Sequence, residues 1–132
     1  MYGKVYCSCL HGIDGKIIET EIDLQRGLPH FHIVGLPDSA VRESMERVRS
    51  AIKNSEFEFP LQRITVNLAP ADLRKEGSGF DLAIAIGILV TSGQWQLEQA
   101  NHTLIIGELA LDGSVRRIPG VLPMIEQAKQ CG

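Results

Sequence analysis

A short polar loop between a strand and an apolar helix carries the residues of this chain that could do chemistry. The alternating residues Arg63–Pro70 predict the strand, and the apolar run Asp81–Val90 predicts the helix. Between them lies the loop Ala71-Asp-Leu-Arg-Lys-Glu-Gly-Ser-Gly79. A charged, glycine-containing loop at such a junction is where α/β folds usually place a site. The interpretation of the whole protein therefore depends on whether this loop is a working site, a relic of one or only a turn.

A nucleotide site is the first chemistry to weigh. Gly77-Ser-Gly79 before a helix resembles the start of a dinucleotide fingerprint, but Leu82 occupies the third glycine position. Asp81 would compete with a bound anion for the positive end of the helix. The sequence contains no P-loop, so we expect no cofactor site and no ATP hydrolysis by this chain alone.

The second possible chemistry is acyl transfer by a serine–lysine pair, Ser78 with Lys75. Such a pair transfers acyl groups only when the lysine is desolvated and acts as a base. The neighbours Arg74 and Glu76 favour a solvated, protonated amine instead, and we expect Ser78 to cap the next helix. We assign no catalytic residue, and a peptidase that uses this pair remains the alternative.

The third possible chemistry is metal binding. Cys7 and Cys9 share one strand face and His30 and His32 another, but simple alternation places them so. Cys-x-Cys with His-x-His is not a standard zinc spacing, and no metal site is assigned. The odd number of cysteines, three, favours a reducing, cytoplasmic setting.

Thirteen basic and sixteen acidic residues leave a formal charge of −3, which argues against constitutive nucleic-acid binding. A local basic patch is still compatible with this charge. Several cations lie at predicted strand or loop ends where they could converge, although a solvated surface is the default. The candidates for a DNA or partner contact are Arg74, Lys75, Arg116 and Arg117, with Arg63 also considered.

The remaining elements predict one mixed α/β domain over residues 1–132. Asp14-Gly15 and Asp112-Gly113 are typical of hairpin turns with positive φ. Between the two hairpins, His30–Val34 predicts a strand, and a helix with Asp38 as its N-cap follows. That helix carries its buried stripe at Val41, Met45, Val48 and Ile52.

The C-terminal third adds an extended run, Thr103–Leu111, a short strand at Val115 and a final helix from about Pro119. The helix Asp81–Val90 is apolar on every face, so we expect it to be buried and Ile86→Asp to unfold the domain. No apolar run is long enough for a bilayer, which predicts a soluble protein. Because the chain ends in the last turn of a predicted helix, we interpret it as a piece of a longer protein or as a domain that lacks its last strand.

Several long segments together identify a family. The chain resembles the N-terminal domain of bacterial magnesium-chelatase-like AAA+ ATPases of the ComM/YifB type, and the match covers essentially the whole chain. The matching segments are Phe31–Asp38, Arg42–Ile52, Ile64–Asp72, Lys75–Ala83 and Gly107–Gly113.

The resemblance implies a fold like the second domain of small-subunit ribosomal protein five, which Lon-type proteases use for their catalytic domain. It also implies an AAA+ module downstream that uses ATP and Mg²⁺. Proteins of this type are hexameric helicases that drive branch migration of DNA in natural transformation. Under this resemblance the present domain serves subunit or DNA contacts, or acts as a pure assembly module.

The Lon-type loop, Lys-Asp-Gly-Pro-Ser-Ala-Gly, allows a direct comparison. Its nucleophilic serine falls on Gly79 here, and Ser78 takes the place of the proline. The partner lysine belongs shortly after a Gly-Gly pair, where this chain has Leu122. The resemblance therefore implies that the fold is kept without the chemistry.

Overall fold

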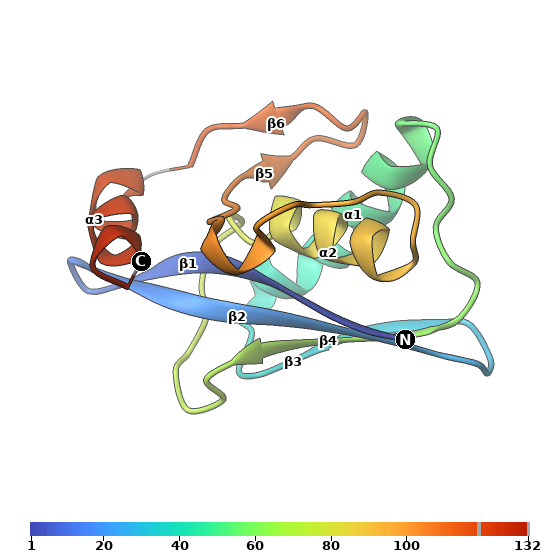
Figure 1. Ribbon diagram of the computed structural model, residues 1–132, viewed down its shortest axis with the longest axis horizontal. Coiled ribbons are helices and arrows are strands. Elements are labelled where there is room, and N and C mark those ends of the chain that lie inside the picture. Colours follow the sequence, from blue (N-terminus) through green and yellow to red (C-terminus); the bar gives the residue numbers. More distant parts are fainter. Residues whose placement is uncertain (119, 132) are drawn as a thin grey trace.

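A four-stranded mixed sheet forms the centre of the computed structural model, which describes residues 1–118 and 120–131 (Figure 1). The neighbouring pairs β1–β2 and β2–β4 are antiparallel, whereas β3 and β4 are parallel. The expected mixed α/β fold is confirmed. In spatial order the strands are β1 (Tyr2–His11), β2 (Asp14–Gln25), β4 (Arg63–Ala69) and β3 (His30–Val34).

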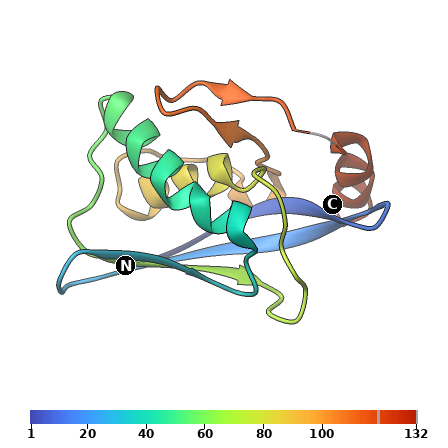
Figure 2. The ribbon, with the colours of Figure 1, turned by 180° about the vertical axis from the view of Figure 1, so that it is seen from behind.

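Two helices cover one face of this sheet, as both Figure 1 and the reverse view in Figure 2 show. Helix α1 (Ser39–Asn54) connects the parallel strands β3 and β4, a connection that needs a crossover. Asp38 is its N-cap, as predicted, because its carboxylate accepts a hydrogen bond of 2.7 Å from the Val41 amide. The predicted stripe also faces the core: Val41, Val48 and Ile52 are buried and Met45 packs against them.

Helix α2 (Asp81–Thr91) is buried on most of its surface. Ile84 and Ile88 have no exposed surface, as the uniformly apolar sequence predicts. Ile86 is only half-buried, so the expectation that it lies deep in the core is wrong. No helix in residues 1–118 and 120–131 is long and apolar enough to cross a membrane.

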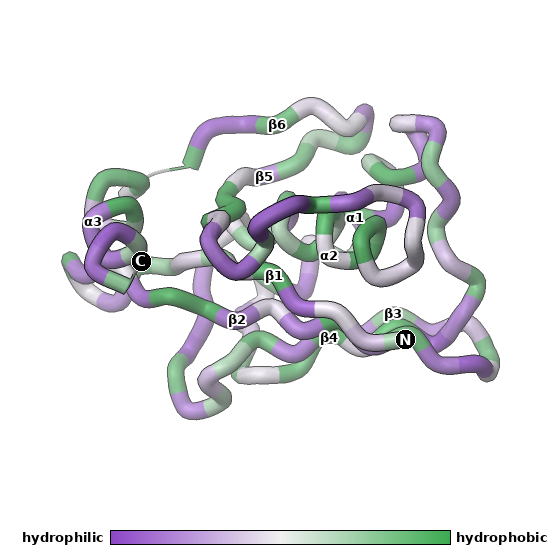
Figure 3. Tube along the Cα trace, viewed as in Figure 1, coloured by the Kyte–Doolittle hydropathy of each residue, from purple (hydrophilic) through white to green (hydrophobic). Residues whose placement is uncertain are grey.

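The first hairpin forms two residues earlier than the sequence suggests. Strand β1 ends at His11 and β2 begins at Asp14, so the turn is Gly12-Ile13, with φ +65° at Gly12. Gly15 lies inside β2, where a Cβ atom would approach the Pro123 carbonyl oxygen to 2.5 Å. This glycine therefore serves a close contact with the last helix rather than a turn. The alternation along β2 is as predicted, with Ile18, Thr20, Ile22 and Leu24 all buried. Figure 3 shows hydrophilic and hydrophobic colours in turn along the tube of β2.

The last third of the chain lies over the helices and the hairpin end (Figure 1). Gly113 has φ +95° between the two short strands, which confirms the second predicted turn. The run Thr103–Leu111 is mostly not a strand, because the Gly107 amide and carbonyl bond to Gly79 and Leu82 instead. Pro119, the expected start of the last helix, lies outside the described residues. The elements here are η1 (Ala100–His102), β5 (Glu108–Leu109), β6 (Val115–Arg116) and α3 (Val121–Cys131).

Candidate functional site

The loop that follows β4 is tied by its backbone to the turn before α1. The Lys75 amide donates to the Leu36 carbonyl, and the Asp38 amide donates to the Lys75 carbonyl, each at 3.0 Å. Pro37 and Lys75 form a single parallel bridge at this point. The middle of the loop is therefore held in place by the N-terminal end of α1.

The side chain of Lys75 lies inside the protein. It has no exposed surface, and its Nζ donates a hydrogen bond to the Pro70 carbonyl oxygen. Burial lowers the pKa of this ammonium group, and the nearby Cys9 and Asp72 side chains oppose that shift. The expectation of a solvated lysine is wrong, because the backbone pairing of Lys75 turns its side chain inward while Arg74 and Glu76 remain exposed.

Ser78 does not have the role predicted for it either. Phe80, in a helical conformation and without a side-chain cap, occupies the N-cap position of α2. The Ser78 carbonyl accepts from the Asp81 amide at 3.4 Å. The hydrogen bond described for Lys75 Nζ goes to Pro70 and not to the Ser78 hydroxyl, so this geometry does not assemble a nucleophile and a base.

The two positions that a Lon-type site would use are also unsuited to catalysis. A Cβ at Gly79 would lie 2.7 Å from Cδ1 of Ile118, so a larger residue there requires Ile118 to move. Leu122 is 74% exposed on α3. These positions therefore bring an apolar packing contact and a solvent-facing leucine in place of a serine and a lysine.

A hollow of about 490 Å³ lies beside the loop and combines residues from β1, α1, the loop and α3. Burial raises the pKa of the Cys9 thiol, whereas the Lys75 ammonium opposes this shift. A neutral thiol is a poor nucleophile. The polar residues that line the hollow are Ser8, Cys9, Asp38, Glu76 and Ser78.

Asp81, expected in the first turn of α2, is an internal salt-bridge partner. Its carboxylate has no exposed surface and accepts two hydrogen bonds from Arg47, at 2.6 and 3.0 Å. The Leu109 amide donates a third at 3.0 Å. Burial raises the pKa of Asp81, and these three donors oppose the shift. These hydrogen bonds link α1, α2 and β5, so the Asp81 carboxylate has a structural role.

The four cations proposed as a contact patch do not converge. The buried Lys75 offers no surface for contact, so that part of the prediction is wrong. Arg74 is 70% exposed on the loop after β4. Arg116 and Arg117 are exposed in or beside β6, which lies across the helical layer from that loop (Figure 1). Contact with DNA by the exposed members stays a prediction.

The cysteine and histidine pairs lie on opposite faces of the sheet. Cys7 and Cys9 are buried on the face that the helices cover, and burial raises the pKa of Cys7 to about 12. His30 and His32 alternate with the buried Phe31, so they point away from that face. Within residues 1–118 and 120–131, no three metal-binding side chains come together.

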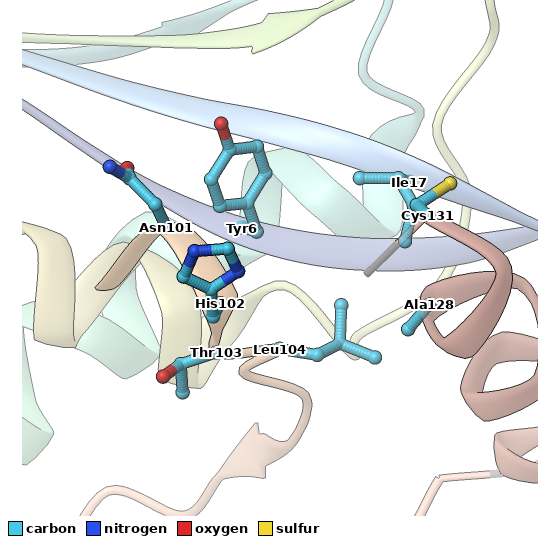
Figure 4. A pocket seen from close by; sticks show the side chains of 8 residues that line it. All are labelled: Tyr6, Ile17, Asn101, His102, Thr103, Leu104, Ala128 and Cys131. Carbon is cyan, nitrogen blue, oxygen red and sulfur yellow. The ribbon is translucent and has the colours of Figure 1, made fainter. Parts of the chain in front are cut away.

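A second hollow, which sequence reasoning missed, lies between β1, β2, η1 and α3. It encloses about 200 Å³, and Figure 4 shows His102 and Asn101 at one end and Ile17 and Cys131 at the other. Its walls come from four separate elements and the segment after η1, so no local sequence motif indicates it. Cys131 is exposed and accepts a weak hydrogen bond from Gln127 within α3.

Comparison with known proteins assigns the chain to a protein family. The model for subunit ChlI of Mg-chelatase matches residues 20–132. The chain belongs to this magnesium-chelatase-like family. Together with the relatives described next, this match confirms the resemblance to the N-terminal domain of proteins of the ComM/YifB type.

Similar proteins come from several bacteria. Competence protein ComM of Haemophilus influenzae is 46% identical over 96% of the chain, which corresponds to 25% of ComM. An uncharacterized protein of Mycobacterium tuberculosis is 44% identical over 98% of the chain and 26% of its own length. Uncharacterized protein YifB of Escherichia coli is 44% identical over 92% of the chain and 24% of its own length. The chain thus spans about a quarter of these relatives.

Proposed function

We propose that this chain is a non-catalytic domain of a longer, cytoplasmic, ring-forming ATPase that acts on DNA. The observation that carries the proposal is its 46% identity to a competence protein over 96% of the chain. The expected reaction is branch migration of DNA strands in natural transformation and recombination. ATP and Mg²⁺ would bind in the part of the longer protein outside this chain, and this domain would supply DNA or subunit contacts.

The fold that we propose is that of the second domain of small-subunit ribosomal protein five, shared with the catalytic domain of Lon-type proteases. The mixed sheet with helices on one face is compatible with it. The loop geometry supports loss of the protease chemistry, since Gly79 packs against Ile118 and Asp81 is bound by Arg47.

A serine–lysine peptidase is the second candidate, and one observation favours it. Lys75 is fully desolvated with a lowered pKa, which is the state that a lysine base requires. Against this, its Nζ is engaged by the Pro70 carbonyl. A pure assembly module without DNA contact is the third candidate, and it agrees with the overall charge of −3.

The test compares the longer protein with and without residues 1–132. We expect removal of this domain to leave ATP binding intact and to abolish strand exchange on a branched DNA substrate. Purified protein would be assayed for ATP binding by calorimetry and for branch migration by gel electrophoresis. Unchanged branch migration after removal would contradict a role in DNA handling, and a longer protein without any DNA activity would contradict the whole proposal.

A further inference from the structure

Two arginines from distant parts of the sequence share one hollow at the start of α1. Arg42 comes from the first turns of α1 and Arg74 from the loop after β4, and the hollow encloses about 400 Å³. We refer to this hollow as the arginine notch. Its lining residues are Leu36, Pro37, Asp38, Ser39, Arg42 and Arg74.

The backbone beneath the arginine notch is fixed in place. The two hydrogen bonds between Lys75 and the Leu36–Asp38 turn join the segments that carry the two arginines. Leu36 has φ +57°, a conformation that costs a non-glycine residue free energy, yet its side chain is 53% exposed. The turn therefore presents an apolar side chain beside the guanidinium groups instead of burying it.

The charges around the arginine notch leave its guanidinium groups available. The Asp38 carboxylate is occupied with the Val41 amide at 2.7 Å, so it caps α1. Arg74 contacts Glu76 at 3.5 Å, but both side chains are about two-thirds exposed, and such pairs contribute only about 0–1 kcal/mol. Arg42 is exposed and forms no ion pair within the residues that the structure describes.

The notch also lies where ligands commonly bind in sheets with parallel strands. Strands β3 and β4 are parallel, and the turn and the loop that form the notch follow their carboxyl ends. Side chains and backbone groups at the carboxyl ends of parallel strands converge on one edge of a sheet. Arginine binds phosphate through paired N–H groups, so two arginines that line one hollow at that edge suit a phosphate ligand.

We propose that the arginine notch binds the phosphate backbone of DNA, with Arg42 and Arg74 as the phosphate ligands and Leu36 against the sugar. This inference rests on the proposed DNA-related function and names the contact surface. It replaces the buried Lys75 with Arg42 as the partner of Arg74.

A carboxylate of a second copy is the competing ligand for the notch. The acidic column on the outer face of β2 is already engaged within the chain. Tyr2 donates to Glu21 at 2.6 Å, Gln25 donates to Asp23 at 2.9 Å and Lys4 contacts Glu19 at 3.5 Å. Self-association of the parent, measured below, distinguishes a carboxylate of a second copy from an external phosphate.

The experiment measures fluorescence anisotropy of a labelled DNA duplex with the 132-residue chain at low salt. We expect weak binding by the parent, with a dissociation constant of about 10⁻⁴ to 10⁻⁶ M. Arg42→Glu with Arg74→Glu should weaken binding at least about tenfold. Removing two phosphate contacts should also reduce the slope of log K against log salt by about 2.

A matched control distinguishes binding at the notch from a general effect of net charge. Arg26→Glu with Lys129→Glu makes the same charge change at two exposed positions outside the notch and should leave binding within about twofold of the parent. Circular dichroism would verify that both double variants are folded. Arg42→Lys with Arg74→Lys should bind at an intermediate level, because lysine keeps the charge but not the paired geometry.

Four results would overturn the inference. They are absence of binding by the parent at low salt, equal loss in both charge-reversed variants, displacement of DNA by inorganic phosphate at the same phosphate concentration, and self-association of the parent that the notch variant abolishes. The last result would assign the notch to a subunit contact and leave the proposed function of the longer protein standing. Loss of function in the longer protein is tested separately by removal of residues 1–132.

Discussion

Lys75 lies in the middle of the loop before α2 and Asp81 is the first residue of α2, and both side chains lie entirely inside the protein, yet they are stabilised in different ways. Asp81 faces a guanidinium group with two hydrogen bonds and a backbone amide with a third. Lys75 has a backbone carbonyl as its described hydrogen-bond acceptor. The Asp81 side chain is thus held by a charge pair, whereas the Lys75 ammonium group faces a neutral dipole.

This difference separates two uses of a buried charge. A paired charge such as Asp81 joins elements, and its removal leaves the partner's charge uncompensated. A charge held by a neutral dipole, such as Lys75, has no charged partner, so its removal leaves no charge uncompensated. The same loop region can therefore look like an active site in sequence while its charged residues serve packing.

The largest expected effect comes from placing a carboxylate on α2 where no arginine can meet it. Ile88→Asp puts a charge at a position without exposed surface, so we expect the domain to unfold, a loss of about 4 kcal/mol or more. Urea denaturation followed by circular dichroism measures this. Ile86→Asp, at a half-buried position on the same helix, should weaken the fold but leave it folded. Equal losses in the two variants would contradict the burial described for α2.

Removing the paired charge ranks next. Asp81→Ala leaves the Arg47 guanidinium and the Leu109 amide without their acceptor, and we expect a loss of about 3 kcal/mol. Glu46→Ala removes an exposed ion pair with Arg49 on α1 and should cost less than about 1 kcal/mol. If the two variants lose similar stability, the Asp81–Arg47 pair is not an internal link.

Removing the unpaired charge should have a smaller effect. Lys75→Ala deletes a buried aliphatic stem and orphans the Pro70 carbonyl, with an expected cost of about 2 kcal/mol. Lys75→Met keeps most of the volume and should cost about 1 kcal/mol or less. Urea denaturation of both variants beside the parent gives these values.

The pH dependence of Lys75 gives a signed test. Its pKa in the folded chain is lowered from 10.5, so the unfolded chain binds more protons between the two values. The Lys75 contribution to stability therefore rises with pH as the pH passes through that window. As the pH rises toward 10.5, we expect the stability of the parent to increase relative to that of Lys75→Met, measured by urea denaturation at each pH. A difference that does not change with pH would show that Lys75 is solvated.

The regular parts of the fold could be predicted from sequence because their signals are local. Alternation places Ile18, Thr20, Ile22 and Leu24 on one buried face, and Asp38 caps α1 as its position indicates. The first hairpin turn could not be placed, because Gly15 is needed for contact with Pro123 on a distant helix. A tertiary contact, and not the turn propensity of Asp14-Gly15, determines where the hairpin turns.

The position of the candidate site could be predicted from the sequence, but the environment of its charged side chains could not. The loop does lie beside a hollow, but the charged neighbours of Lys75 suggested a solvated amine. The inward direction of Lys75 depends on backbone bonds to Leu36 and Asp38, which are far away in sequence. Likewise, the convergence of Arg42 on Arg74 follows from the same pairing and has no local signal.

The loop between β4 and α2 stabilises the fold and does not act as a nucleophilic site. The most direct measurement is labelling of the 132-residue chain with a serine-reactive fluorophosphonate, followed by peptide mass spectrometry. The account predicts that Ser78 reacts no faster than the exposed Ser39 and that Lys75→Met leaves its rate unchanged. Selective labelling of Ser78 that disappears in Lys75→Met would contradict the account and establish the serine–lysine pair.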